Sequence, residues 1–120
     1  MRTLIATLIA LMLFAATPVV ARDLEDGVAA FKAGDYQKAF RLFERLAEQG
    51  DVNSQYNLGV IYNNGYAVPD DYARGYAWVS IAAARGNAGS KKFKEMLAKF
   101  TTPAQIAEVQ KLSSELWKNT

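Results

Sequence analysis

The sequence predicts an all-α protein built as a short right-handed array of helical hairpins, an α-solenoid. Apolar residues recur at intervals of three and four in several segments, and turns that contain glycine separate these segments. The segment 35–40 aligns with the segment 71–76, which reveals an internal repeat of 36 residues. A repeat of this length made of two helices is typical of a solenoid, in which each hairpin stacks on the next. The chain has 120 residues and no Cys, so helix packing must supply its stability without disulfides.

Residues 1–21 have the pattern of a secretory signal peptide. Arg2 precedes an apolar run from Leu4 to Ala16, and small residues stand where a signal peptidase would cleave after Ala21. The alternative is an uncleaved membrane anchor, but the run is shorter than the roughly 20 residues that span a bilayer. We therefore expect a mature chain that begins at Arg22, has no membrane span, and is periplasmic or secreted.

The segment 22–50 is expected to form the first helical hairpin. Its first helix begins with acidic side chains, which suit the positive end of a helix dipole, and Gly34 ends it. Asp35 then starts a second helix. The apolar positions of this second helix have amphipathic spacing and are Tyr36, Ala39, Phe40, Phe43 and Leu46.

The segment 51–86 predicts two further helices joined by a tight turn. In the first helix Leu58 and Tyr62 lie one turn apart on one face, and Gly59 beside them lets another helix approach closely. Gly65 provides the positive φ that a tight reversal needs.

The second helix of this pair is expected to begin after Asp70 or Asp71, because either side chain can accept hydrogen bonds from the first free N–H groups. Small residues recur along it beside one large aromatic residue, Trp78, and Gly86 ends it. We predict that Trp78 fills the space beside Gly59, so that the two helices pack as a knob in a groove.

The segment 87–120 is expected to form a hairpin that caps the array. Asn87 can cap its first helix, and Thr102 with Gln105 has the pattern of a capping box at the start of the second. Further apolar positions follow up to Trp117. The predicted apolar face of the first helix consists of Phe93, Met96, Leu97 and Phe100.

A family resemblance rests on these residues. The pattern that resembles a Sel1-like repeat is Tyr56-x-Leu58-Gly59-x-x-Tyr62-x-x-Gly65-x-x-Val68-x-x-Asp71-x-Ala73-Arg74, then Trp78, Ala82-Ala83 and Gly86-Asn87. The chain departs from it at Gly75, where a helix-favouring alanine is common and where glycine costs about 1 kcal/mol. The shorter turn of the segment 22–50 makes that unit look more like a tetratricopeptide hairpin. The ending of the chain is similar to that of small exported bacterial Sel1-like proteins. The resemblance implies an α-solenoid that binds other proteins, and it implies no reaction.

Residue types that usually carry catalysis are scarce. The chain has no His and no Cys, so the acid–base, nucleophilic and metal-binding arrangements built on them are absent. The adjacent carboxylates Asp70 and Asp71 are explained as helix caps. We expect no enzyme activity, no cofactor and no metal site. The net charge of +2 gives no reason to expect nucleic acid as a partner.

Two surfaces remain as candidate binding sites. The first is a polar stripe on the helix that starts at residue 52, where asparagine amides can both donate to and accept from a partner's backbone. In solenoids of this type the first helix of each pair lines the inner groove. The stripe consists of Asn53, Asn57, Val60 and Asn64. The second surface is a basic helical face, which suits an acidic partner or an anionic surface and consists of Lys91, Lys92, Lys94 and Lys99.

Together these features predict an exported protein–protein interaction module, a scaffold or adaptor that acts as a monomer. It would bind a peptide or a protein surface in the cell envelope. Two alternatives stay open: a module that binds cell-wall glycan or peptidoglycan peptide through an aromatic and asparagine-rich groove, and an envelope hydrolase.

Overall fold

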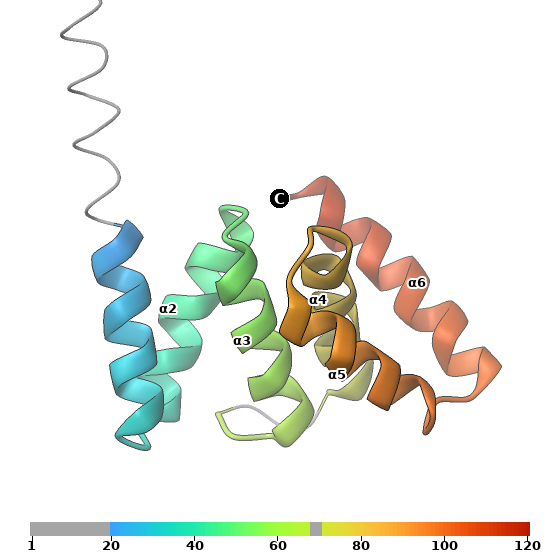
Figure 1. Ribbon diagram of the computed structural model, residues 1–120, viewed down its shortest axis with the longest axis horizontal. Helices are drawn as coiled ribbons and strands as arrows, with labels where there is room; N and C mark the ends of the chain where they lie inside the picture. Colours follow the sequence, from blue (N-terminus) through green and yellow to red (C-terminus); the bar gives the residue numbers. More distant parts are fainter. Residues whose placement is uncertain (1–19, 68–70) are drawn as a thin grey trace, which may run out of the picture.

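The computed structural model describes residues 20–67 and 71–120, which form six helices and no strand (Figure 1). The all-α solenoid predicted from the sequence is confirmed. The expected signal peptide lies almost entirely outside the described residues, as does Asp70. A first helix covers residues 20–32. It is followed by α2 (Tyr36–Glu48), α3 (Val52–Asn64), α4 (Tyr72–Ala84), α5 (Ala88–Ala98) and α6 (Pro103–Lys118).

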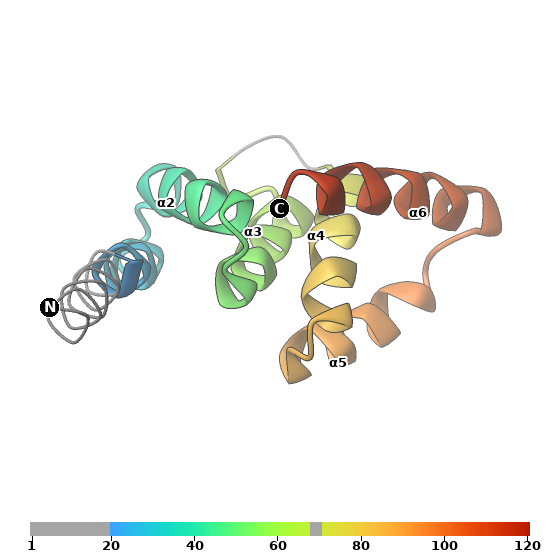
Figure 2. The same cartoon turned by 90° about the horizontal axis from the view of Figure 1, so that it is seen from above.

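The helices form two layers around α4. The first helix, α3 and α5 lie on one side of the molecule, and α2 and α6 lie on the other (Figure 2). Successive helices from α2 to α5 pack on their neighbours, and α6 returns to pack on α4. The C-terminal pair therefore differs from a simple hairpin, because α5 and α6 make their main contacts with α4 and not with each other.

Local capping explains where the helices start. The side chains of Asp35, Asp71, Asn87 and Thr102 each accept a hydrogen bond from a backbone N–H three residues later, as the sequence predicts. The capping box at Thr102 is complete, since the side chain of Gln105 also accepts from the Thr102 N–H at 2.9 Å.

The crossing of α3 and α4 is built on two glycines. A Cβ added to Gly59 would lie 2.6 Å from Val79 Cγ2 and 2.9 Å from Gly75 O, and one added to Gly75 would lie 3.0 Å from Gly59 O. The prediction that Trp78 fills the space beside Gly59 is therefore wrong, because Val79 and the Gly75 backbone fill it. Trp78 stands one position earlier on the helix, is 3% exposed, and packs in the core with Leu58. Gly75, which lowers the helix propensity of α4, therefore also allows the close contact with the backbone of α3.

The core has two parts. The larger cluster joins the first four helices and contains Ala30, Ala39, Phe43, Ala47, Leu58, Ile61, Trp78 and Ile81. The smaller cluster joins α4, α5 and α6 and contains Tyr76, Ala77, Leu97 and Val109.

The apolar face predicted for α5 is only partly correct. Leu97 is buried and Phe93 is half-buried, but Met96 is 45% exposed and Phe100 is 79% exposed. These two side chains stay exposed because α6 turns away to pack on α4 and leaves the outer side of α5 uncovered. Within the part of the chain that the structure describes, no helix is long and apolar enough to cross a membrane.

Candidate protein-binding groove

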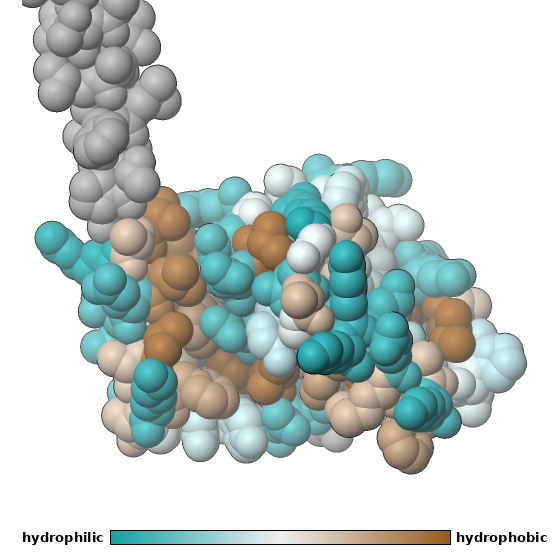
Figure 3. All heavy atoms as spheres, viewed as in Figure 1, coloured by the Kyte–Doolittle hydropathy of each residue, from teal (hydrophilic) through white to brown (hydrophobic). Residues whose placement is uncertain are grey.

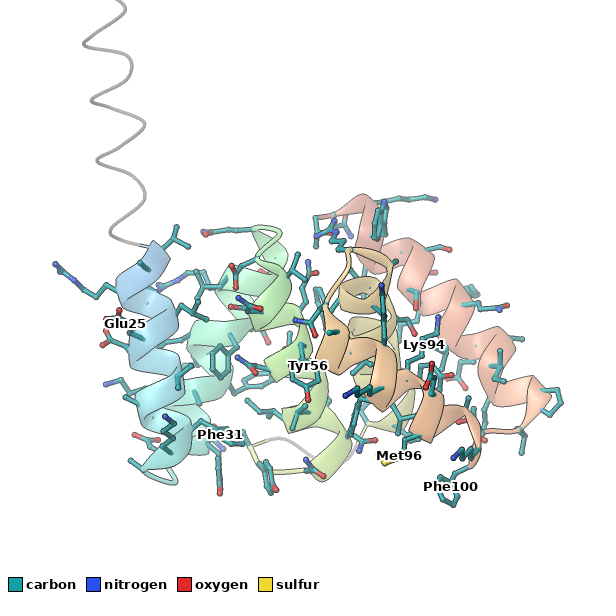
Figure 4. The ribbon with its side chains drawn as sticks, viewed as in Figure 1. Glu25, Phe31, Tyr56, Lys94, Met96 and Phe100 are labelled. Carbon is teal, nitrogen blue, oxygen red and sulfur yellow. The ribbon has the colours of Figure 1, made fainter. Side chains whose placement is uncertain are left out.

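A groove lies between the first helix and α3, with α2 as its floor. It has a volume of about 260 Å³. Apolar residues gather along the first helix on this face of the molecule (Figure 3), and Phe31 and Tyr56 come from the two helices that form the walls (Figure 4). The lining residues are Val28, Phe31 and Lys32 from the first helix, Phe43 from α2, and Tyr56, Asn57 and Val60 from α3.

Close packing at the floor sets the position of the first helix. A Cβ added to Gly27 would lie 2.7 Å from Cε1 of Phe43, so only glycine lets the first helix sit this close to α2. Arg45 Nη2 also forms an ion pair with Asp23 Oδ2 at 2.9 Å, which adds a polar link between the same two helices. The role of Gly27 could not be predicted from the sequence, because a glycine within a helical pattern does not show which helix approaches it.

An aromatic cluster supports one wall of the groove. The ring of Phe31 meets the rings of Tyr36 and Tyr66 edge to face, with centroids 5.3 and 5.8 Å apart. The rings of Tyr36 and Tyr66 stack on each other at 4.6 Å. These contacts restrict Phe31 and make the wall a preformed surface.

The chemistry of the groove is mainly apolar, with two polar groups. The side chain of Asn57 is half-buried, and no hydrogen bond to it is found among the described residues. Lys32 is exposed at the rim and has no ion pair within residues 20–67 and 71–120. The whole of α3 lacks charged residues. The groove therefore suits an apolar side chain, with an amide available to the backbone that carries it.

The groove includes the middle of the predicted asparagine stripe and leaves out its two ends. Asn57 and Val60 line the groove. Asn53 instead accepts a hydrogen bond from Asn87 Nδ2 at 3.4 Å, at the start of α5, and Asn64 is exposed at the last position of α3. The four residues share one face but extend over about 17 Å of helix, and only the middle two line the pocket.

The predicted basic residues lie apart from this groove. Lys91, Lys92, Lys94 and Lys99 are all exposed on α5 and its C-cap. At 100° per residue they spread over about 160° of the helix circumference, so they do not point at a single spot. Lys94 borders a separate hollow of about 270 Å³ next to α6, together with Ser80 and Gln110.

Comparison with known proteins defines the family. The Sel1 repeat model matches residues 24–51 and 52–87, more than half of the chain. The chain belongs to the Sel1 repeat family. Sel1 repeats generally mediate protein–protein interaction. The first matched repeat contributes one wall of the groove and the second contributes the other, so the groove is a product of the two repeats together.

Two curated relatives match a shorter stretch. The proteins named DAP3-binding cell death enhancer 1 from Rattus norvegicus and Mus musculus are each 35% identical to this chain over 48 residues. The match covers 40% of this chain and 9% of each relative. The matched stretch thus spans less than a tenth of the length of these relatives.

The Sel1 repeats also border a second cavity on the other side of the molecule. It has a volume of about 350 Å³, and its lining includes Glu44, Glu48, Tyr62 and Arg74. Burial raises the pKa of Glu44, and the nearby charge of Glu48 raises it further, whereas Arg74 lowers it. Burial also raises the pKa of the Tyr62 phenol. Arg74 lies 6.0 Å from the centroid of the Tyr62 ring and its Nε lies 3.7 Å from Asp71 Oδ2, so its charge is already shared between these neighbours.

Proposed function

We propose that this protein is an exported interaction module whose groove between the first helix and α3 binds a segment of a partner protein. The observation that carries this proposal is the open, apolar groove itself, whose walls come from both Sel1 repeats. The partner segment would place one large apolar side chain against Val28, Phe31 and Val60. Full burial of such a side chain contributes about 1.5–3 kcal/mol.

The polar groups of the groove would fix the orientation of the segment. The Asn57 amide carries both a donor and an acceptor, so it can pair with one backbone N–H and one C=O of the partner. Lys32 at the rim favours an acidic residue next to the anchor, mainly through the rate and specificity of association. Because Gly27 and the aromatic cluster hold the walls in place, little ordering cost accompanies binding.

The proposed location in the cell envelope or outside the cell rests on the signal-peptide pattern of residues 1–21. Mass spectrometry of the protein from its own cells tests it, with a mature N-terminus at Arg22 as the expected result. A chain that keeps residues 1–21 and stays with the membrane fraction would contradict export.

Groove binding is tested by photo-crosslinking followed by titration. A photoreactive residue in place of Val60 should capture a partner from an envelope extract, and the same residue in place of Asn64 should not. The affinity of the captured partner is then measured for Val60→Asp and for the matched control Asn64→Asp. Both variants add one negative charge to α3, but only the first places it in the groove.

We expect Val60→Asp to weaken binding at least tenfold, because a carboxylate in an apolar site must be desolvated without a partner. Asn64→Asp should bind as the parent does. Circular dichroism melting of both variants checks that the fold is intact. Equal affinities for Val60→Asp and the parent would place the partner on another surface.

A further inference from the structure

An exposed apolar corner lies where α5 ends and the chain turns toward α6. Phe100 is 79% exposed and points away from the helices, and Met96, one turn earlier, is 45% exposed (Figure 4). Leu97, which lies between them in sequence, is buried and belongs to the smaller core cluster. One side of the end of α5 is therefore packed in the core, and only the outer side is exposed.

Hydrogen bonds hold this corner in a fixed shape. The backbone N–H of Phe100 donates to Leu97 O at 3.0 Å, and the Thr101 hydroxyl donates to the same carbonyl at 2.6 Å. Tyr72, on α4, donates from its hydroxyl to Leu97 O at 3.1 Å and also contacts the hydroxyl of Thr101. The turn is thus attached to α4, and Phe100 is presented to solvent by a structured backbone.

Positive charge surrounds the corner. Four lysines and one acid, Glu95, are found on α5 and its C-cap, and none of the lysines forms an ion pair within the described ranges. At 100° per residue, two of the lysines fall within about 60° of Met96 around the axis of α5, and Phe100 directly follows the second of them in the turn. These four neighbours are Lys92, Met96, Lys99 and Phe100.

We propose that this corner docks on the surface of an anionic lipid bilayer. Phe100 and Met96 would enter the boundary between headgroups and acyl chains, while Lys92 and Lys99 keep their ammonium groups at the level of the lipid phosphates. Anionic headgroups supply negative partners for these lysines, which form no ion pair among the described residues.

The shape of the corner favours a bilayer over a protein partner. Aromatic hot spots in protein interfaces usually lie at the packed, desolvated centre of a patch. Phe100 instead protrudes at one end of the molecule and is 79% exposed (Figure 4). Phe31 of the groove lies at the opposite end (Figure 4), so docking at this corner would leave the groove open. The proposal therefore stands independently of groove binding.

The test uses two proteins, each labelled with a dye at a single introduced cysteine, which is possible because the chain has no native Cys. Met96→Cys carries an environment-sensitive dye at the corner, and Gln49→Cys carries it at an exposed turn after α2. With vesicles rich in phosphatidylglycerol, we expect the dye at position 96 to shift to the blue and to become shielded from an aqueous quencher. The dye at position 49 should not change, and pure phosphatidylcholine vesicles should have little effect on either dye. Because each dye reports only its own site, the result holds whether or not residues 1–21 are retained.

Variants then connect the response to the residues. Phe100→Ser, made in the chain labelled at position 96, should weaken vesicle binding by about tenfold or more because the anchoring ring is lost. Lys92→Glu with Lys99→Glu should remove the preference for anionic lipid, whereas Lys111→Glu, an exposed charge reversal on α6, serves as the control and should change it little. Melting temperatures should match the parent, since all four side chains are exposed.

Three outcomes would overturn the proposal. The first is an unchanged dye at position 96 with anionic vesicles, or an unchanged affinity for Phe100→Ser. The second is a shift caused by poly-L-glutamate in place of lipid, which would assign the corner to an acidic protein. The third is a shift that depends on protein concentration without vesicles, which would mean that a second copy of the chain covers the corner.

Discussion

Substitution of Gly59 by alanine tests the packing on which the second repeat depends. The added Cβ would lie 2.6 Å from Val79 Cγ2, 2.9 Å from Gly75 O and 3.2 Å from Val79 N. Two of these three neighbours are backbone atoms, which cannot rotate away, so α3 and α4 must separate. Overpacking of this kind costs about 1–3 kcal/mol or more. Alanine returns up to about 1 kcal/mol through its higher helix propensity. The clash should dominate, and we expect a net loss of about 1–2 kcal/mol of unfolding free energy.

The same substitution at Gly89 provides a matched control. Its added Cβ would meet nothing closer than 3.4 Å, which is ordinary contact, so Gly89→Ala should leave stability unchanged or raise it by a few tenths of a kcal/mol. Val79 is 0% exposed, so Val79→Ala alone should destabilise the fold by leaving a cavity. In the Gly59→Ala background the same substitution should cost less, because it also removes the clashing Cγ2 methyl, although the contact with Gly75 O remains. Denaturant unfolding followed by circular dichroism measures all five proteins. A Gly59→Ala variant as stable as the parent would refute the close crossing.

Three further expectations follow from the site and the core. Asn57→Ala should weaken partner binding by about tenfold with little effect on melting. Asn53→Ala should leave binding unchanged, because of these two residues only Asn57 lines the groove. Equal effects of the two variants in a binding titration would contradict this. Trp78→Ala should cost about 3–5 kcal/mol in denaturant unfolding, since the ring is 3% exposed, and a near-parental value would mean that the site is poorly packed. The raised pKa of Glu44 means that its ionisation disfavours the folded state, so its contribution is most favourable below the ordinary pKa of 4.5 and is lost as pH rises through the higher folded value. Glu44→Gln should therefore melt above the parent at neutral pH and lose this advantage in acid, and a pH-independent difference between the two melting curves would contradict the cause.

Local features were predictable from the sequence because neighbours in the chain determine them. Asp35, Asp71, Asn87 and Thr102 cap helices through bonds to residues three positions away, so their residue types and spacing carry the whole signal. The repeat of 36 residues likewise predicted the order and approximate length of the helices.

Contacts between helices were less predictable, because spacing identifies a face and not its neighbour. Gly59 was correctly expected at a close approach, but the sequence could not tell that Val79 and Gly75 fill the space rather than Trp78. Asn53 and Asn57 share one face of α3, yet only the path of the first helix decides which of them borders a groove.

The position of α6 explains both the cap of the array and its exposed corner. Because α6 packs along α4, it buries Val109 in the smaller core cluster and covers the apolar end of the array. The same path takes α6 away from the outer side of α5, where Met96 and Phe100 remain exposed to water. Their spacing in the sequence placed them on the same predicted apolar face as Leu97, which is buried. Helical periodicity therefore marks residues that are able to be buried, and the next helix determines which of them are. Apolar residues that the fold leaves uncovered contribute little to its stability, so in this chain a surface for docking can change without weakening the core.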